Sequence, residues 1–315
     1  MGKKVSIIIP VYNEEGNISL LVSQLNSLKK VIPQEDMEII FIDDGSDDKT
    51  FEVLKSLREK GEDIVIIRFK RNFGQTSAIA AGLEYAKGDI VITMDGDLQN
   101  DPQDIPFLIS QLEEGYDVVS GWRKERKDSF WSRKLPSYLA NLLISWYTGV
   151  KLHDYGCTLK AYRRDLVKDL TLYGELHRFI PALMSWKGAR IKEVPVRHHP
   201  RKSGKSKYGL RRIVNVILDL LTVKFLLASS KGPMQIFGRV GLLFILGGFF
   251  CGLLTVIMKL TRGIDMTGNP LLYLTIFLII MSLQIISIGL LGEINMRIYN
   301  ESCHRKIYTI QEIIK

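Results

Sequence analysis

Hydrophobic and polar positions form short alternating blocks over residues 5–120. Apolar runs of strand length lie at residues 5–11, 37–42, 64–69 and 90–94. Because these runs lack the alternation of half-exposed strands, they predict strands buried on both faces, as in a parallel sheet. The intervening stretches repeat apolar residues at helical spacing and predict helices at 17–30, 50–60, 76–87 and 104–114, with Gly88 as the C-terminal cap of the third. A fifth strand begins at 117–120, and this order predicts an α/β fold with a mostly parallel sheet.

The pattern changes towards the C-terminus, where two apolar stretches carry no charge. They lie at 240–258 and 270–292, and each is long enough to cross a hydrocarbon core of about 30 Å. The link at 259–269 is too short for a domain, so the two spans are expected to form a hairpin. Basic residues are more frequent on both flanks of the hairpin than in the link. The positive-inside rule therefore places both termini in the cytoplasm.

These patterns divide the chain into three predicted parts. Residues 1–209 form a cytoplasmic α/β domain. Residues 210–235 form an interfacial amphipathic region, because their apolar run is interrupted by Asp219 and Lys224. Residues 236–315 hold the two spans and a short cytoplasmic tail. A further amphipathic stretch at 135–147 fits either a membrane interface or a helix packed on the sheet.

Charge narrows the choice of partner. The 43 lysines and arginines outnumber the 34 aspartates and glutamates, and the net charge of +9 favours an anionic partner. The basic residues gather near the predicted spans and no nucleic-acid-binding module is recognisable. We therefore expect a lipid surface or a phosphorylated substrate rather than nucleic acid. The three cysteines, Cys157, Cys251 and Cys303, show neither a disulfide framework nor a zinc spacing, which fits a reducing compartment.

Two carboxylates follow the fourth predicted strand directly, in Asp95-Gly96-Asp97, and Gln99 comes next. Open α/β sheets bind ligands at the carboxyl ends of their strands. Gly96 is expected to let the backbone turn sharply and approach a ligand closely. Oxygen ligands of this kind suit a hard divalent cation that also holds a diphosphate, so Mg²⁺ or Mn²⁺ is expected. A solvated acidic turn is the alternative.

Polar loops follow the other predicted strands as well. The four loops read PVYNEE, DDGS, RNFGQ and DGDLQ in chain order. Polar loops that converge on one edge of a sheet make a ligand site. No G-x-G-x-x-G follows the first strand, so the dinucleotide-binding fingerprint is absent.

A family resemblance is visible in the same segments. The segments SIIIPVYNEE, IDDGSDD, RNFGQTSAIAAG and MDGDLQNDP resemble the nucleotide-sugar domain of family 2 glycosyltransferases with a GT-A fold. Later segments, GWRKERKD, HDYGC, HRFIPAL and RKSGKSKYG, are similar to those of the polyprenyl-phosphate glycosyltransferases. That group holds dolichol-phosphate mannose synthase and the bacterial undecaprenyl-phosphate glucosyl- and aminoarabinosyltransferases. The resemblance covers nearly the whole chain, and the hairpin ending in LLGE matches the bacterial members.

The resemblance implies a role for several strand-end residues. The base and ribose of the donor would be held by Pro10, Tyr12, Glu14 and Asp43. The metal that bridges the diphosphate would be bound by Asp95, Asp97 and Gln99, which makes Asp97 a catalytic residue and brings Asp95 to the nucleotide. The role of Asp44 stays open: it is either a ligand contact or a turn residue supported by Gly45 and Ser46.

A basic loop precedes the membrane segment and reads R-x-x-G-x-S-K-Y from Arg201 to Tyr208. By its chemistry and by the resemblance it is a phosphate clamp, with Arg201, Ser206 and Lys207 as contacts for the acceptor phosphate. Arg123 and Arg133 are further candidates for the same phosphate. The alternative is a polybasic patch attracted to anionic lipid.

Asp154, in the segment HDYGC, is the candidate catalytic carboxylate near the reacting centre. A phosphate monoester has its second pKa near about 6, so such an acceptor can attack without a general base. Asp154 is therefore either a general base or a group that orients the partners of the phosphate or a sugar hydroxyl. A turn residue before Gly156 is the third alternative.

The resemblance implies an inverting, metal-dependent glycosyltransferase of the inner membrane. It would move a sugar from a nucleotide diphosphate sugar, UDP-glucose or a related UDP-sugar, to undecaprenyl or another polyprenyl phosphate at the cytoplasmic face of the bilayer. A homo-oligomer is compatible with the sequence. Two rival functions are an inactive nucleotide-sugar-binding sensor or scaffold, which the intact metal residues oppose, and a processive polysaccharide synthase. The latter would carry a Q-x-x-R-W motif and more spans.

Overall fold

The structure is a computed structural model of the 315-residue chain. It describes residues 4–32, 36–124, 144–145, 148–168, 170, 172, 176–200, 233–302 and 307–315. The chain divides into two compact units. The first comprises Met1–Leu220 with Lys306–Lys315, and the second comprises Leu221–Arg305.

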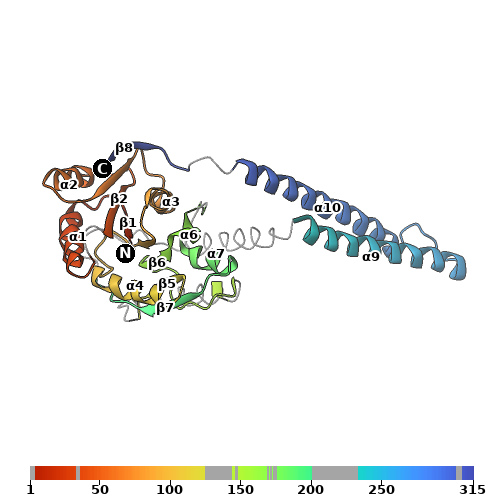
Figure 1. The fold of residues 1–315 in the computed structure, drawn as a ribbon. Coiled ribbons are helices and arrows are strands. Elements are labelled where there is room, and N and C mark those ends of the chain that lie inside the picture. Colours follow the sequence, from red (N-terminus) through yellow and green to blue (C-terminus); the bar gives the residue numbers. More distant parts are fainter. Residues whose placement is uncertain are drawn as a thin grey trace. The chain divides into compact units, whose positions relative to one another are not determined.

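The first unit is built on one eight-stranded sheet with the order β7-β5-β6-β4-β1-β2-β3-β8 (Figure 1). In chain order the strands are β1 (Val5–Val11), β2 (Met37–Asp43), β3 (Val65–Phe69), β4 (Ile90–Thr93), β5 (Val118–Trp122), β6 (Lys160–Arg163), β7 (Ile191–Pro195) and β8 (Ile310–Ile314). The pairs β1·β2, β1·β4, β2·β3 and β5·β7 are parallel, whereas β6 and β8 run antiparallel to their neighbours. The prediction of a mostly parallel sheet is confirmed.

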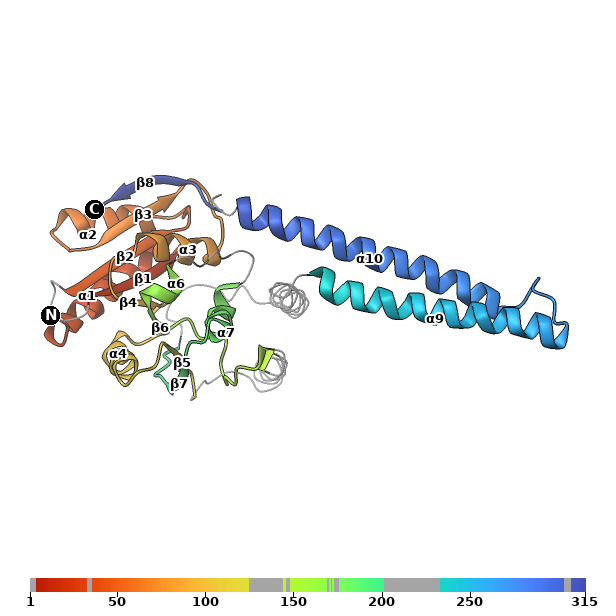
Figure 2. The ribbon, with the colours of Figure 1, turned by 45° about the vertical axis from the view of Figure 1, so that its right-hand side comes forward.

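Helices cover both faces of this sheet (Figure 2). One face carries α1 (Glu15–Ser27), α2 (Thr50–Glu59) and α4 (Ile105–Glu113), whose apolar residues join Ile7 and Ile9 of β1 in one core cluster. The other face carries α3 (Gln75–Tyr85), in which Gly82 lies directly against Ile8. On that face Ile79 of α3 shares a cavity with Thr93 of β4 and Ile180 of α7 (Ile180–Trp186). Because helices cover both faces of the sheet, every residue of β1 is buried.

Short helical segments complete the first unit. They are α6 (Arg164–Val167) and the 3₁₀ turns η1 (Leu28–Lys30), η3 (Pro102–Asp104) and η5 (Leu176–Phe179). The prediction that Gly88 caps the third helix is wrong, because α3 ends at Tyr85 and its C-cap residue is Ala86. Gly88 is needed for another reason: a Cβ there would meet the backbone nitrogen of Ser6 at 2.6 Å.

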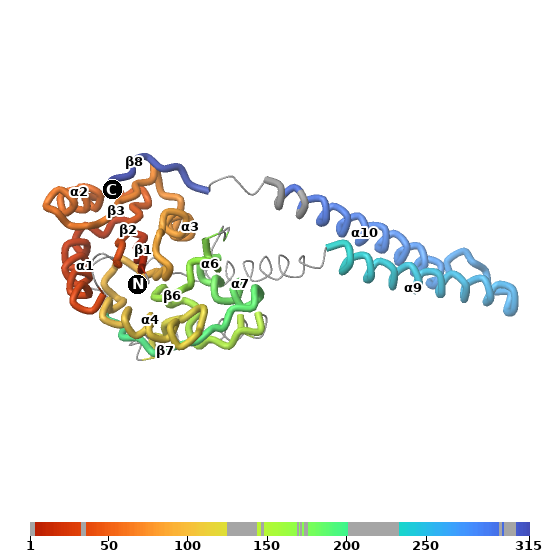
Figure 3. Tube along the Cα trace, viewed as in Figure 1, coloured from red at the N-terminus to blue at the C-terminus, as the bar shows by residue number. Residues whose placement is uncertain are grey.

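The C-terminal strand β8 returns to the first unit after the apolar helices. It pairs antiparallel with β3, so the last residues of the chain lie beside β3 at the edge of the sheet (Figure 3). Tyr308 precedes β8, stacks on Phe69 with ring centroids 5.0 Å apart, and donates a hydrogen bond to Glu84 of α3. The segment expected to be a tail is therefore a part of the sheet.

The second unit is a pair of long helices, α9 (Pro233–Arg262) and α10 (Pro270–Ser302), which contain the two stretches expected to span a membrane. Both are long and apolar enough to cross a bilayer, and only 17% of each apolar window is buried, unlike a core helix. The helices pack closely because Ser282 donates to the carbonyl of Gly241 at 2.9 Å and Gly289 lies against Phe237. The predicted interfacial region lies outside the described residues except at 233–235, and the amphipathic stretch at 135–147 lies outside them except at 144–145.

Candidate functional site

The loops that carry the predicted site residues meet at one edge of the sheet. The carboxyl ends of β1, β2, β3, β4, β5 and β7 share this edge because these strands run in one direction. The antiparallel strand β6 starts there, so the residues that precede Lys160 join the same edge. The edge therefore collects Tyr12, Asp43, Asp95, Arg123 and Asp154 from five segments of the chain.

Asp43, at the end of β2, is fully buried. Its Oδ1 atom accepts a hydrogen bond from the backbone N–H of Ser46 at 3.0 Å. Its Oδ2 atom lies 3.6 Å from Nε of Arg68, and neither atom has a hydrogen-bond partner among the described residues. Burial raises the pKa of Asp43, and the Ser46 hydrogen bonds and Arg68 lower it in part. A buried acceptor without a donor is suited to an N–H of a ligand.

Tyr12 and Glu14 lie on the loop after β1, which is tied to the loop after β2. Asn13 has a positive φ of 57°, donates its N–H to Oγ of Ser46 at 3.0 Å and accepts from the N–H of Asp47. The Tyr12 hydroxyl donates to Asp47 at 3.2 Å, and Asn17 donates to the Glu14 carboxylate at 2.5 Å. Each of these predicted nucleotide residues is thus held in place by its neighbours.

Asp44, which the sequence left open between a ligand contact and a turn residue, binds the backbone of a different loop. Its two carboxylate oxygens accept from the backbone N–H groups of Phe73 at 2.7 Å and Gly74 at 2.9 Å. This ties the loop after β2 to the loop after β3. Burial raises the pKa of Asp44 to about 6, although the two N–H groups lower it in part.

The acidic loop after β4 holds Asp95 and Asp97 on the same edge. Asp95 accepts from the side-chain amide of Gln75 at 2.7 Å, and Asp97 accepts from the backbone N–H of Gln99 at 3.1 Å. Leu98, between Asp97 and Gln99, has a φ of +61°, which is uncommon for a residue other than glycine. The expected sharp turn is therefore made at Leu98. Gly96 instead allows close packing, since a Cβ there would lie 2.6 Å from Val11.

The carboxylates of this loop fit a divalent cation. Burial first, and then the charge of Asp97, raise the pKa of Asp95 to about 6, so a positive charge would stabilise the ionised pair. Within the described ranges no group of three or more histidine, cysteine, aspartate or glutamate side chains is arranged to hold a metal. Mg²⁺ typically takes one or two protein carboxylates and completes its shell with substrate phosphates and water.

Asp154 forms a bidentate ion pair with Arg123. Nε of Arg123 donates to Oδ2 of Asp154 at 2.7 Å, and Nη2 donates to Oδ1 at 3.0 Å. Burial alone would lower the pKa of Arg123, but the hydrogen bond and charge of Asp154 raise it. The backbone N–H of Asp154 donates to Glu193 of β7 at 3.0 Å. Two of the predicted site residues thus form one partly buried ion pair.

The remaining predicted phosphate contacts, Arg133, Arg201, Ser206 and Lys207, lie outside the described residues. The segment before the predicted clamp docks on the acidic loop. There the N–H of His199 donates to the carbonyl of Gln99 at 2.9 Å, and Arg197 pairs with Asp101 at 3.1 Å and Asp104 at 2.8 Å.

Several site residues were not identified from the sequence. Arg68 pairs with Asp43, Glu193 supports Asp154, and Lys160 and Arg178 line a cavity beside the edge. The segment HRFIPAL, which contains Arg178, contributed to the family resemblance, but no role was predicted for Arg178. Nothing in the sequence indicated that Lys160 belongs to a site, because lysine side chains are usually exposed to solvent.

An α/β sheet with acidic and polar loops gathered at its carboxyl edge is typical of a protein that binds its ligand at that edge. The profile of the family described as Glycosyl transferase family 2 matches residues 6–171. The dodecaprenyl-phosphate galacturonate synthase of Rhizobium johnstonii is 41% identical over 98% of this chain and 93% of its own length. The chain therefore belongs to glycosyl transferase family 2 and is a glycosyltransferase.

A further relative and two solved structures are also similar to this chain. The undecaprenyl-phosphate 4-deoxy-4-formamido-L-arabinose transferase of Yersinia enterocolitica is 39% identical over 99% of this chain and 94% of its own length. The crystal structure of mannosyl-3-phosphoglycerate synthase from Rubrobacter xylanophilus has a TM-score of 0.59 at 16% identity, covering 73% of this chain and 76% of that one. Glucosyl-3-phosphoglycerate synthase from Mycobacterium tuberculosis, in complex with Mn²⁺, UDP and glucosyl-3-phosphoglycerate, has a TM-score of 0.54 at 20% identity, covering 70% and 80%. These likenesses confirm the predicted GT-A-like fold.

Proposed function

We propose that this glycosyltransferase moves a sugar from a nucleoside diphosphate sugar, preferably a UDP-sugar, to a polyprenyl phosphate at a membrane surface. The observation that carries the proposal is the combination, in one chain, of the acidic strand-end site and two helices long enough to span a bilayer. Relatives named as a polyprenyl-phosphate sugar synthase and a polyprenyl-phosphate sugar transferase, 41% and 39% identical over nearly the whole chain, support the proposal.

The loops after β1 and β2 would bind the nucleoside. The buried Oδ2 atom of Asp43 offers an acceptor to a base N–H, and Tyr12 and Glu14 lie on the adjoining loop, held by Asp47 and Asn17. Pro10 is buried at the end of β1, in register with Ile42. Asp44 supports this pocket by fixing the loop at Phe73 and Gly74.

Asp95, Asp97 and Gln99 would hold Mg²⁺ or Mn²⁺ at the diphosphate. When bound, the cation supplies charge stabilisation to the leaving nucleoside diphosphate. Gln75 fixes one oxygen of Asp95, and the Gln99 N–H fixes one oxygen of Asp97, so hydrogen bonds within the protein hold both carboxylates. This preorganisation lowers the reorganisation needed during transfer.

The acceptor phosphate would attack the anomeric carbon. A new bond forms from phosphate oxygen to carbon, the bond from that carbon to the diphosphate breaks, and configuration inverts in this single displacement. A monoester dianion needs no proton removed, because its second pKa is near about 6. Asp154, already bound through both oxygens to Arg123, would therefore orient that guanidinium toward the phosphate instead of acting as a general base.

The clamp residues Arg201, Ser206 and Lys207, with Arg133, would complete the binding of the acceptor. The segment that leads into the clamp is fixed to the acidic loop by the hydrogen bond from His199 to Gln99. This contact supports a clamp close to the metal site. A lipid phosphate lies at headgroup depth, so a clamp just before the membrane segment is suitably placed.

The two apolar helices would anchor the enzyme in the inner membrane, with the catalytic unit and both termini in the cytoplasm. The pairing of β8 with β3 supports this topology. Because β8 follows α10 and belongs to the catalytic sheet, the chain must return to the side from which it entered. An even number of crossings meets that requirement.

A direct test uses full-length protein purified in detergent, undecaprenyl phosphate, and a panel containing UDP-glucose, UDP-galacturonate and UDP-4-deoxy-4-formamido-L-arabinose. Mass spectrometry of the lipid product identifies the sugar that is transferred. A lipid-linked sugar is the expected result, and NMR spectroscopy of the product should show an inverted anomeric configuration. Binding of nucleotide sugar without turnover would instead establish a sensor or scaffold.

A further inference from the structure

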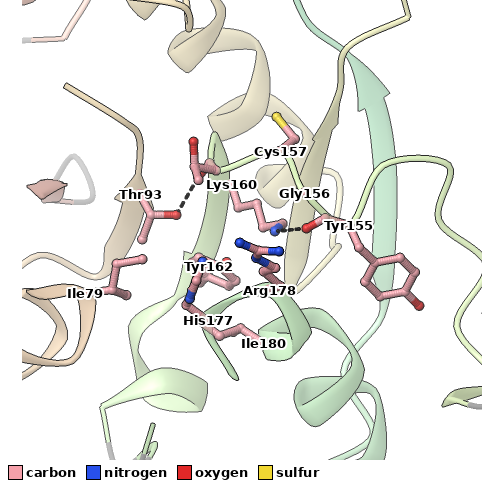
Figure 4. Close-up of a pocket in the computed structure, with 11 residues that line it drawn as sticks. Ile79, Thr93, Tyr155, Gly156, Cys157, Lys160, Tyr162, His177, Arg178 and Ile180 are labelled. Atoms are coloured by element: carbon pink, nitrogen blue, oxygen red, sulfur yellow. Dashed lines mark hydrogen bonds between the residues drawn. The ribbon is translucent and has the colours of Figure 1, made fainter. Parts of the chain in front are cut away.

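A small cavity lies beside the site, between the start of β6 and the segment η5–α7 (Figure 4). Its volume is about 10 Å³, which admits one water molecule or one oxygen of a larger group. The charged side chains that line it are Lys160 and Arg178, and His177, Thr93 and Thr158 add polar groups. A cavity of this size and polarity is unsuited to an apolar ligand.

The cavity is electropositive. Lys160 is 2% exposed and its ammonium group donates to the backbone carbonyl of Tyr155 at 3.1 Å. No carboxylate in the described part of the chain forms an ion pair with Lys160. The Lys160 and Arg178 head groups lie close together in Figure 4. Burial, together with the charges of Arg123 and Arg178, lowers the pKa of Lys160 to about 8, although Cys157 and Asp154 oppose this.

Hydrogen bonds link the residues that surround the cavity. Oγ1 of Thr93 donates to the carbonyl of Thr158 at 2.8 Å, and His177 is hydrogen-bonded to Thr76 of α3 at 2.7 Å. Burying a cation without an acidic partner is costly. The protein nevertheless holds this lysine in fixed surroundings at the end of the sheet where the ligands are expected.

The cavity also borders the reacting centre. Lys160 is in register with Thr93, two residues before Asp95, and its charge partly offsets the raised pKa of Asp95. Tyr155, Gly156 and Cys157, which line the cavity, directly follow Asp154 in the chain. The Arg123 guanidinium pairs with Asp154, and Lys160 and Arg178 are two further cationic side chains at the cavity beside it.

We propose that Lys160 and Arg178 form an anion subsite that receives one oxygen of a substrate oxyanion. This inference rests on the proposed function, which supplies two oxyanions besides the diphosphate. One is the phosphate of the lipid acceptor, and the other is a carboxylate on the transferred sugar, as in a uronic acid. Both present a charged oxygen to two cations, which strengthens each hydrogen bond.

The test compares full-length wild type with Lys160→Met, Arg178→Gln and Arg178→Lys in detergent. The first two remove a charge at similar size, and the third keeps it. Ile79→Val, which changes the same cavity wall without altering charge, is the control. In one arm undecaprenyl phosphate is varied at saturating donor. In the other, UDP-galacturonate and UDP-galactose are compared, because they differ by a carboxylate in place of a hydroxymethyl group.

We expect Lys160→Met and Arg178→Gln to raise one KM by about tenfold to a hundredfold, while Arg178→Lys recovers part of the loss. A change confined to the lipid identifies the acceptor phosphate as the occupant. Loss of preference for the uronate identifies the sugar carboxylate. Unchanged KM values and an unchanged donor ratio would overturn the subsite, as would a fall in kcat alone.

A separate readout distinguishes failure of the subsite from failure of the proposed function. Inorganic phosphate should raise the thermal unfolding temperature of wild type more than that of Lys160→Met, even if no sugar is transferred. Equal phosphate shifts in both proteins would reject the subsite. Absence of transfer from every donor, with the phosphate difference intact, would reject the proposed reaction and retain the subsite.

Discussion

At the scale of single residues, neighbouring carboxylates in this site have different tasks. Asp43 leaves one buried oxygen without a donor, whereas both oxygens of the adjacent Asp44 are bound by the backbone of another loop. Asp95 and Asp97 lie close enough for the charge of Asp97 to raise the pKa of Asp95. The side-chain type is the same in each case, and the surroundings decide what it does.

Asp97→Asn should abolish turnover without unfolding the protein. Asparagine keeps an oxygen that can accept from the Gln99 N–H, but it removes a charge from the proposed metal site. We expect kcat/KM to fall on the order of 100-fold or more, with little change in the thermal unfolding temperature. EDTA should mimic the variant, and Mg²⁺ or Mn²⁺ should reverse the effect of EDTA on wild type.

The control for this prediction is Asp63→Asn, at an exposed ion pair with Arg58. It should retain wild-type rates. Full activity of Asp97→Asn, or of wild type in excess chelator, would contradict the metal site.

Asp44 should give the fold a specific pH dependence. Its folded-state pKa of about 6 lies above the ordinary value of 3.8, because the ionised form is buried. Its stabilising contribution is therefore fully present below about pH 4 and is lost as the pH rises through about 6. Relative to Asp44→Asn, which does not titrate, wild type should lose up to about 3 kcal/mol of stability over this interval.

Thermal unfolding of both full-length proteins in detergent, from pH 4 to 7.5, measures this effect. The difference in unfolding temperature should shrink or change sign in favour of the variant as the pH rises. A difference independent of pH would mean that Asp44 titrates as an exposed carboxylate.

The basic loop offers a matched pair of lysines. If the loop is a phosphate clamp, Lys207→Ala should raise the KM for the lipid about tenfold to a hundredfold, since one charge-assisted contact is lost. Lys205→Ala, two residues away, should have a much smaller effect. Equal effects of both substitutions would identify the loop as a polybasic membrane patch. Initial rates at varied undecaprenyl phosphate decide between the two.

At the scale of elements, strand β8 connects the end of the chain to β3 and the loop that follows it. Tyr308 stacks on Phe69, whose ring meets the Phe73 ring edge-to-face with centroids 5.8 Å apart. The N–H of Phe73 is in turn bound by Asp44. The C-terminal segment therefore supports the loop after β3 through a short chain of contacts.

Tyr308→Ala should lower both stability and nucleotide affinity. The change removes a buried ring and the hydrogen bond to Glu84, for a loss of about 3 kcal/mol. Ile307→Ala, at an exposed neighbour, is the control. Thermal unfolding and UDP binding by calorimetry measure the two effects. Wild-type values for both would show that β8 merely covers the edge of the sheet.

At the scale of the whole molecule, the strand pairing constrains the membrane topology. The link between α9 and α10 should lie outside the cytoplasm, and the catalytic unit inside. In an active cysteine-free background, a cysteine at Thr267 should react with a membrane-impermeant thiol reagent in intact cells. A cysteine at the exposed residue Lys60 should react only after lysis. The reverse labelling pattern would contradict a cytoplasmic donor site.

The sequence by itself determined the order of elements in the first half of the chain, the two apolar helices and the loops that carry the acidic residues. The strands β1 to β4 were predicted because burial on both faces leaves unbroken apolar runs. The apolar helices were predicted because a bilayer demands length without charge. Both signals are local, so they can be read without knowing what lies opposite.

Only the tertiary structure decided which distant residues meet. The antiparallel strands β6 and β8 are short and were not predicted, since their partners β4, β5 and β3 lie far away in the chain. The pairs Arg123 with Asp154, Asp43 with Arg68 and Lys160 with Arg178 likewise depend on how the strands are ordered. Sequence spacing does not encode such pairings, because they arise from the crossovers that bring separate strand ends to one edge.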